Sequence, residues 1–384
     1  MGPVSSCLAT RPFGRQETLQ TASQIDPIGW SAPAPDVALP SCAVIIPSFN
    51  SAKFIDIALS SLELQTRRPD EVIVVDAGST DGTGEIVASF RQTLNVSFLT
   101  APRTTQGAAR NVGILAAQSD TITFLDSDDI FLSHHIESAA RILADQPEID
   151  AVRGYNVQWN SAADVLELSY DFLRPIDNEV EIFECSINLS TLTIRRRALM
   201  ERDMLFAGNL RGRYCEDWDF VLRLLASGAR MQYVQEPVSV ITERPGSHTR
   251  KSIFWKMRFL LLRSLIDNEH LVAARRRGDA RALDRIAAGV DTQRFKAALT
   301  MLSAGRPRMA RRLHNRLQNP RYRRITGVAI AVSWIVPGAP RLFRWAASRM
   351  GGYGHWRPRT PFALPDEPAV EQLRKRWLDK LLRA

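Results

Sequence analysis

Four short runs of consecutive apolar residues, each followed by a segment with helical spacing, constrain the fold of this chain most strongly. The apolar runs are residues 43–46, 72–75, 96–99 and 122–125, and the helical segments after them are 52–65, 83–90, 106–117 and 133–144. Uninterrupted apolar strands are typical of a parallel sheet with both faces covered. Their alternation with helices indicates βαβ units, so we expect an α/β domain.

Polar and acidic residues follow three of these strands, at the edge where ligands bind in parallel α/β sheets. The segments are 47–50, 76–79 and 126–129. In the last of them, Asp126, Asp128 and Asp129 repel one another unless a cation lies between them. Such oxygen ligands suit Mg²⁺ or Mn²⁺. The alternative is a solvated acidic turn with an aspartate as helix N-cap.

The segment 76–83 combines aspartates and glycines at the start of a helix, which predicts backbone amides facing a ligand. Asp76 is placed to bind a base or a ribose, and the alternative is an ordinary Asx turn. No GxGxxG or Walker A pattern occurs, which disfavours nicotinamide cofactors and P-loop chemistry.

Further candidates lie on later segments, and each has a structural alternative. We expect Arg110 to pair with Asp128 or with a phosphate, or else to form a surface ion pair. Glu216 and Asp217 open a helix, where acids are favoured in any case, but one of them is a candidate general base. Trp218 is placed either to stack on a sugar or to lie buried in its helix. His248 either reaches a diphosphate or a metal or is structural.

The charge of the chain is divided unevenly, which indicates three regions. Residues 251–384 carry 29 Lys and Arg against 9 Asp and Glu, whereas residues 1–250 carry 21 against 32. We expect a disordered lead-in over 1–40, an acidic folded body over 41–250 and a basic, mainly helical region over 251–384. The four cysteines form no CxxC pair, which disfavours a disulfide scaffold or a cysteine-rich zinc site.

Two interpretations of the basic region stay open. It either faces an anionic surface such as lipid headgroups, or packs onto its own acidic body or a second copy. Trp334, Phe343 and Trp345 beside clustered arginines favour the inner face of the cytoplasmic membrane. The apolar run 325–340 is too short to span a bilayer and indicates a core or in-plane helix. No secretory signal is seen, so we expect a cytoplasmic protein, peripheral at that face.

Five motifs, taken in order, resemble family-2 glycosyltransferases with the GT-A fold, over about residues 41–250. They are 44–50 (VIIPSFN), 74–83 (VVDAGSTDGT), 107–113 (GAARNVG), 124–129 (FLDSDD) and 216–219 (EDWD) with Arg223. Single motifs of this kind are weak, and their joint order carries the resemblance. The fold class that it implies is a GT-A, Rossmann-like sheet followed by the basic helical extension.

The resemblance also implies roles for individual residues. Pro47, Phe49, Asn50 and Asp76 would line the nucleotide pocket, with Arg110, Trp218 and Ser247 also binding the nucleotide-sugar. Asp126 and Asp128 would form the DxD pair that contacts ribose and holds Mn²⁺ or Mg²⁺, with His248 as a further metal ligand. Asp217 would be the catalytic base, supported by Glu216. Two departures from the family are Ala77, where a second acid is common, and the absence of a histidine before Gly246.

The implied function is an inverting transfer of a sugar from a nucleotide-diphosphate donor to a hydroxyl of a glycan or a lipid-linked acceptor. One alternative is a non-catalytic GT-A-like binding or scaffold protein. Another is a sugar-nucleotide pyrophosphorylase, but its glycine-rich basic loop is replaced here by 47–50. A nucleic-acid partner is not expected, because no nucleic-acid motif interleaves the arginines with aromatic residues.

Overall fold

The computed structural model describes residues 38–101, 104–161, 163–168, 188–208, 215–243, 266, 269–270, 272–273, 275–276, 280–336, 338–343, 360–361 and 367–382. Residues 1–37 of the expected lead-in, parts of the basic region expected over 251–384, and Ser247 and His248 lie outside these ranges. The elements are β1 (Cys42–Ser48), α1 (Ile55–Glu63), β2 (Glu71–Asp76), α2 (Thr83–Ser89), η2 (Phe90–Gln92), β3 (Val96–Thr100), α3 (Gln106–Ala116), β4 (Thr121–Phe124), β5 (Ile130–Phe131), α4 (His135–Asp145), β6 (Ala151–Asn160), β7 (Val165–Leu168), η5 (Leu189–Thr191), β8 (Leu192–Arg195), α5 (Arg196–Glu201), α7 (Glu216–Ala226), β9 (Met231–Glu243), α9 (Ala280–Ser303), α10 (Pro307–His314), α11 (Pro320–Ile335), β10 (Thr360–Pro361) and α13 (Pro368–Leu382).

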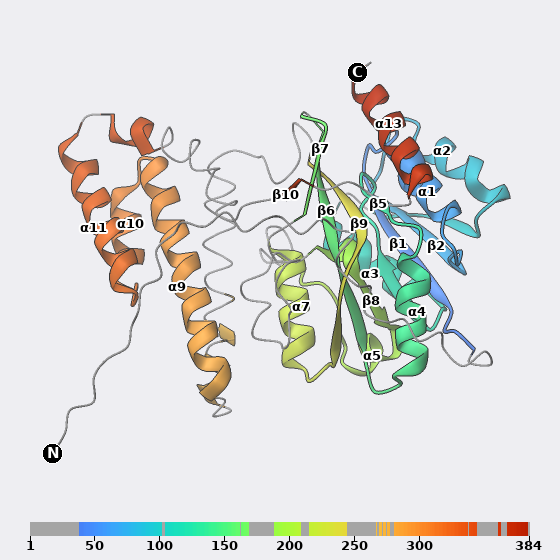
Figure 1. Cartoon of the computed structure of the whole chain (residues 1–384), viewed down its shortest axis with the longest axis horizontal. Coiled ribbons are helices and arrows are strands. Elements are labelled where there is room, and N and C mark those ends of the chain that lie inside the picture. The colour runs from blue at the N-terminus through green and yellow to red at the C-terminus, as the bar shows by residue number, and fades with distance from the viewer. Residues whose placement is uncertain are drawn as a thin grey trace. The chain divides into compact units, whose positions relative to one another are not determined.

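The strands form one mixed sheet with the order β10-β7-β6-β8-β4-β1-β2-β3, and β9 pairs with β5 and β6 (Figure 1). The four strands expected from the apolar runs are parallel, as predicted. The sheet then continues with β8, which is antiparallel to β4, and with the antiparallel pair of β6 and β7. A short connection over residues 161–164 joins β6 to β7, which only antiparallel neighbours permit. The expectation of a parallel sheet therefore holds for β1 to β4, and the rest of the sheet is mixed, since β6 also pairs in parallel with β9.

The register of the parallel strands brings their polar ends together. Ser48 at the end of β1 lies opposite Asp76 of β2, and Asp76 lies opposite Thr100 of β3. Ile45 pairs with Phe124, so β4 ends beside β1 and runs directly into the acidic residues after it. All seven residues of β1 are buried, because helices and neighbouring strands cover both of its faces.

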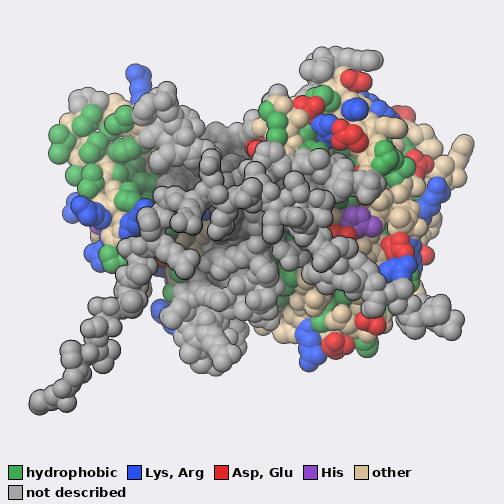
Figure 2. Space-filling view, viewed as in Figure 1, with side chains coloured by type: hydrophobic (Ala, Val, Ile, Leu, Met, Phe, Trp, Pro, Cys, Tyr) green, Lys and Arg blue, Asp and Glu red, His purple; other side chains and the backbone are tan. Residues whose placement is uncertain are grey.

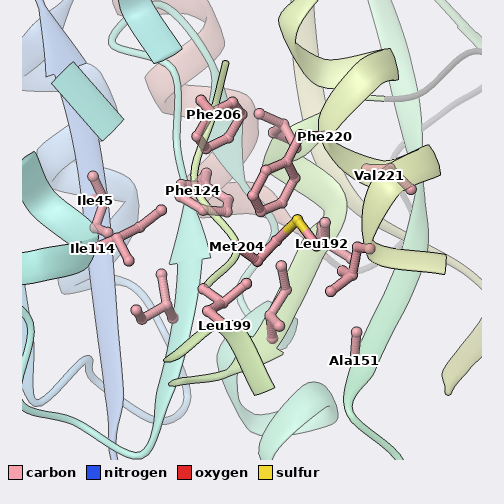
Figure 3. Packing of buried hydrophobic residues seen from close by; sticks show 14 of the residues in the cluster. Ile45, Ile114, Phe124, Ala151, Leu192, Leu199, Met204, Phe206, Phe220 and Val221 are labelled. Atoms are coloured by element: carbon pink, nitrogen blue, oxygen red, sulfur yellow. The ribbon is translucent and has the colours of Figure 1, made fainter. Parts of the chain in front are cut away.

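Helix α3 packs unusually close to the sheet because its inner face is built from small residues. A Cβ on Gly113 would lie 2.5 Å from Cγ2 of Ile45, so only glycine permits this approach. Below α3, Phe206 stacks on Phe220 with ring centroids 4.1 Å apart, and Phe124 meets both rings edge-on. Figure 3 shows these three rings within the largest buried cluster. This aromatic wall supports α3 and α7, the two helices that carry the site.

Helices α9, α10 and α11 pack on one another around a small apolar core. Its buried residues include Ala298 and Met301 of α9, Leu313 of α10 and Ile330 of α11. A short turn separates the first two of these helices, since α9 ends at Ser303 and α10 begins at Pro307. Among the described residues, no helix has the length and apolarity needed to cross a membrane.

The last helix, α13, packs against the domain that carries the mixed sheet. Trp377 is fully buried, stacks on Phe54 with centroids 5.0 Å apart, and meets Trp159 edge-on at 4.8 Å. Basic residues of α13 pair with acidic residues of the domain: Arg374 with Asp164, and Arg376 and Lys380 with Asp56. This helix therefore follows the interpretation in which the basic region packs onto its own acidic body. The boundary at residue 250 stays a prediction.

Candidate active site

The candidate site is organised around a buried arginine that contacts three carboxylates. Arg110 of α3 is only 1% exposed. Its Nη2 lies 2.6 Å from Oδ1 of Asp126, and its Nη1 lies 2.6 Å from Oε1 of Glu216 and 3.3 Å from Oδ1 of Asp217. Burial alone would lower the pKa of Arg110, but the three carboxylates outweigh it and raise that pKa. One guanidinium thus joins the acidic run after β4 to the acidic pair that opens α7.

Local sequence explains why these groups meet. Thr105 caps α3 by accepting a hydrogen bond from the backbone amide of Ala108. The amide of Gly107 donates to Oε2 of Glu216 at 3.1 Å, and a Cβ at Gly107 would approach Phe206 to 3.0 Å. The small residues of α3 therefore let α7 come close enough for Glu216 to bind both a backbone amide and Arg110.

A second contact holds the aromatic wall against α3. The side-chain amide of Asn111 donates to the carbonyl of Phe206, and its Oδ1 accepts from the amide of Phe206 at 2.8 Å. The guanidinium carbon of Arg110 lies 5.5 Å from the centre of the Phe206 ring, within the range of a cation–π contact. Asn111 and Phe206 therefore fix where Arg110 sits.

The two acids that open α7 differ in exposure. The side chain of Glu216 is 13% exposed and that of Asp217 is 36% exposed. Burial raises the pKa of Glu216 above its ordinary value, partly offset by Arg110. Burial, together with the charges of Glu216 and Asp126, raises the pKa of Asp217 to about 7 despite the opposing effect of Arg110. A carboxylate that is accessible and titrates near neutral pH has the properties of a general base.

The three aspartates after β4 have different environments. Asp129 is buried, accepts from the Oγ of Ser190 at 2.9 Å and from the amide of Thr242 at 3.0 Å. Burial and the neighbouring Asp128 and Asp126 raise the pKa of Asp129 well above its ordinary value. Asp129 therefore ties the acidic turn to η5 and β9. Asp126 and Asp128 remain partly exposed.

These carboxylates fit a divalent cation that also takes phosphate oxygens. Asp126, Asp128 and Asp217 are all partly exposed, and they lie beside the buried pair of Arg110 and Glu216. Mg²⁺ and Mn²⁺ are commonly held by one or two carboxylates together with substrate phosphates. Within the described ranges, no group of three or more His, Cys, Asp or Glu forms a protein-only cage for a metal.

At the ends of β1 and β2, Asp76 shapes the loop that follows it. Its carboxylate accepts hydrogen bonds from the amides of Gly78 and Ser79, at 3.0 and 2.7 Å, and from the hydroxyl of Ser79. Asn50 adopts a left-handed conformation with φ of 48°, and its Oδ1 accepts from the amide of Thr80 at 3.1 Å. The Asx-turn interpretation of Asp76 therefore describes the observed contacts, and Asn50 joins the two loops.

The other predicted site residues differ in how exposed their side chains are. Phe49 follows β1 and is 44% exposed, so its ring is accessible beside Asn50. Pro47 is buried within β1. Trp218 is almost entirely buried in the largest apolar cluster, which favours the core interpretation of this residue over sugar stacking. Ser247 and His248 lie outside the described residues.

The structure brings together Asp126, Arg110, Glu216 and Asp217, from three separate sequence motifs. The pairing of Arg110 expected with Asp128 is instead made with Asp126, because α3 lies directly beside the end of β4. Sequence reasoning missed Phe206, Ser190 and Thr242. Their contacts span 61 to 113 positions along the chain, so no local pattern indicates them.

The mixed α/β sheet resembles the fold of GT-A glycosyltransferases. Residues 43–203 match the model of the family described as glycosyl transferase family 2. The likeness inferred from the five motifs is thereby confirmed.

Named relatives that the chain resembles are also glycosyltransferases. The chain is 30% identical over 214 residues to the poly(ribitol-phosphate) β-N-acetylglucosaminyltransferase TarS of Staphylococcus aureus, covering 54% of this chain and 36% of the relative. It is 29% identical over 202 residues to a PGL/p-HBAD biosynthesis glycosyltransferase of Mycobacterium bovis, covering 50% and 73%. The crystal structure of S. aureus TarS 1–349 in complex with UDP-GlcNAc has a TM-score of 0.51 at 20% identity and covers 85% of this chain and 98% of that one. The chain spans only 19%, 36% and 32% of three of the curated relatives it matches.

Proposed function

We propose that this protein transfers a sugar from a nucleotide-diphosphate donor to an acceptor hydroxyl, with inversion at the anomeric carbon. The observation that carries the proposal is Asp217, a partly exposed carboxylate with a pKa of about 7. It is joined through Arg110 to Asp126 at the carboxyl edge of the sheet. The proposed base and the acidic turn that we propose faces the diphosphate are thus joined by one buried guanidinium.

The chemistry follows from that arrangement. Asp217 accepts the proton of the acceptor hydroxyl as its oxygen attacks the anomeric carbon. The bond from that carbon to the diphosphate oxygen breaks on the opposite face, and the nucleoside diphosphate leaves with the bonding electron pair. Glu216, held by Gly107 and Arg110, keeps the start of α7 in place and adds negative charge that raises the proton affinity of Asp217.

Arg110 acts in this account as a positioning residue. Its guanidinium is buried and already engaged by three carboxylates, so charge on the leaving diphosphate must be met by other groups. Asp126 and Asp128 are the ligands we propose for Mn²⁺ or Mg²⁺, with His248 as a further candidate. The bound cation would neutralise the negative charge that develops on the diphosphate.

The donor pocket is proposed to lie at the ends of β1 and β2. The exposed ring of Phe49 offers a surface on which a base can stack, and Pro47, Asn50 and Asp76 shape the loops around it. The TarS relative is named as a β-N-acetylglucosaminyltransferase, so UDP-GlcNAc is the first donor to test. The acceptor is proposed to be a hydroxyl of a glycan or of a lipid-linked saccharide.

Thermal stabilisation by nucleotides tests the proposal. The full chain is heated with UDP, GDP, dTDP or CMP, each with and without Mn²⁺, in parallel with Asp128→Ala. We expect one nucleotide to raise the melting temperature only with metal, and the variant to lose this effect. If no nucleotide stabilises the folded protein, the donor site is not formed and the non-catalytic alternative is favoured.

A further inference from the structure

Helix α11 is apolar on its outer face as well as on the face that packs inward. Thr326, Ala329 and Ile330 are buried against α9 and α10. On the opposite side, Val328 and Ile335 are 61% and 77% exposed. A helix that is hydrophobic all round is normally covered on all sides, so the outer face of α11 lacks the polar surface expected of a solvated helix.

Three exposed apolar residues and the half-buried Val332 form a stripe along α11. Ile325, Val328, Val332 and Ile335 recur at intervals of three or four along α11, which places them on one side of the helix. Trp334 is also exposed in the last turn of α11, and Val336 and Leu342 are exposed beyond the end of the helix. Figure 2 shows hydrophobic side chains gathered over this part of the molecule, with basic side chains beside them.

The charge around this stripe is of one sign. No aspartate or glutamate occurs between Asp291 and Asp366, and that interval contains 15 arginines and lysines. Arg321 and Arg324 lie exposed at the first turn of α11, next to Ile325, and neither forms an ion pair within the described ranges. Their charges are therefore available to an external anion.

We propose that the outer face of α11 is a docking surface for an anionic lipid membrane, with the helix lying in the plane of the interface. An apolar stripe bordered by arginine and by an exposed tryptophan has the composition of in-plane helices at the headgroup boundary. Each arginine near an anionic surface strengthens attachment. The sequence pattern that indicated an in-plane segment over 325–340 is thereby assigned a specific face. The proposal does not depend on the glycosyltransferase activity.

Charge complementarity selects the membrane over the other occupants. A second copy would bring a second set of arginines with no acidic residue in this interval to pair with them, so like charges would oppose its approach. A nucleic acid would satisfy the arginines but would leave the stripe of Val328, Val332 and Ile335 exposed to water. An anionic bilayer satisfies both features at once.

Flotation of the full chain with vesicles tests the proposal. Vesicles of phosphatidylcholine alone are compared with vesicles containing about one third phosphatidylglycerol. We expect binding to the anionic vesicles that weakens as salt is raised. Val328→Gln with Ile335→Gln should reduce partitioning at least about tenfold. Arg321→Ala with Arg324→Ala should reduce it by roughly thirtyfold at low salt, and only on anionic vesicles.

Leu115→Gln is the matched control, because Leu115 lies on α3 and is 60% exposed. This variant should bind vesicles as the original chain does. Circular dichroism and thermal melting confirm that each variant is folded. Absence of binding to anionic vesicles by the folded chain would overturn the proposal. So would binding that Val328→Gln with Ile335→Gln leaves unchanged, or a dimer in light scattering that the same pair abolishes without any effect on vesicles.

Discussion

Replacing Arg110 by alanine should destabilise the catalytic domain severely, because the change leaves three carboxylates without their shared cation. Arg110 is 1% exposed and contacts Asp126 and Glu216 at 2.6 Å and Asp217 at 3.3 Å. Removing one partner of a buried charge network typically costs about 3–5 kcal/mol. For a domain of this size, we expect the melting temperature to fall by roughly 6–20 °C.

The pH dependence of this loss identifies its cause. Without Arg110, the pKa values of Glu216 and Asp217 should rise further, since Arg110 is the charge that lowers them. Protonation at pH 5 would then neutralise the unpaired carboxylates, so the destabilisation should be smaller at pH 5 than at pH 8. Arg110→Lys should lose less stability than Arg110→Ala, because it keeps a positive charge. The recovery should be incomplete, because a single ammonium cannot bind Asp126 and Glu216 in the forked geometry of arginine.

Urea denaturation at both pH values measures the effect, and Arg141→Ala provides the matched control. Arg141 pairs with Glu137 on the surface of α4, one helical turn away, and removing such a pair costs about 0.5 kcal/mol or less. The reasoning is refuted if Arg110→Ala loses no more stability than Arg141→Ala, or if its loss is the same at pH 5 and pH 8.

Three further predictions follow from the same structure. Trp377→Ala should lower the free energy of unfolding by about 3–5 kcal/mol in urea denaturation, since Trp377 is fully buried. Its neighbour Lys375 is exposed, and Lys375→Ala should change stability little; equal effects would show that α13 contributes no packing. The value of kcat/KM should rise with pH through about 7 as Asp217 loses its proton, and a profile flat from pH 5 to 9 would argue against this base. Chelation by EDTA should abolish sugar transfer, and added Mn²⁺ or Mg²⁺ should restore it. The variant Asp128→Asn should require a higher metal concentration. Full activity in EDTA would show that transfer needs no metal.

Much of the parallel half of the fold could be predicted from the sequence because its signals are local. The apolar runs at 43–46, 72–75 and 122–125 each fall within an observed strand or extend it by one residue. Uninterrupted burial leaves few other interpretations for such runs. The rest of the sheet has weaker local signals. The short strands β5 and β7 have two and four residues, too few for a period to show.

The site was predictable in composition but not in its contacts. The order of the motifs indicated Asp126, Glu216 and Asp217 as candidate site residues. Which of them Arg110 contacts depends on how α3 lies relative to α7 and to the residues after β4. The role of Gly107 illustrates the limit. The amide of Gly107 donates a 3.1 Å hydrogen bond to Glu216, which lies 109 positions further along the chain. A local sequence pattern does not contain both residues. The docking of α13 on the domain is likewise a long-range contact that charge asymmetry only indicated.

The most direct test of the central claim is the transfer rate of Asp217→Asn. Asparagine keeps the shape of the side chain but cannot accept the acceptor proton. Because the folded protein raises the pKa of Asp217 above its ordinary value, the charged form costs stability as the pH rises through about 7. The variant should therefore be at least as stable as the original chain at pH 8. We predict that it binds the donor nucleotide normally and loses transfer by a factor of at least about a hundred. Near-normal transfer by the folded, donor-binding variant would contradict the account.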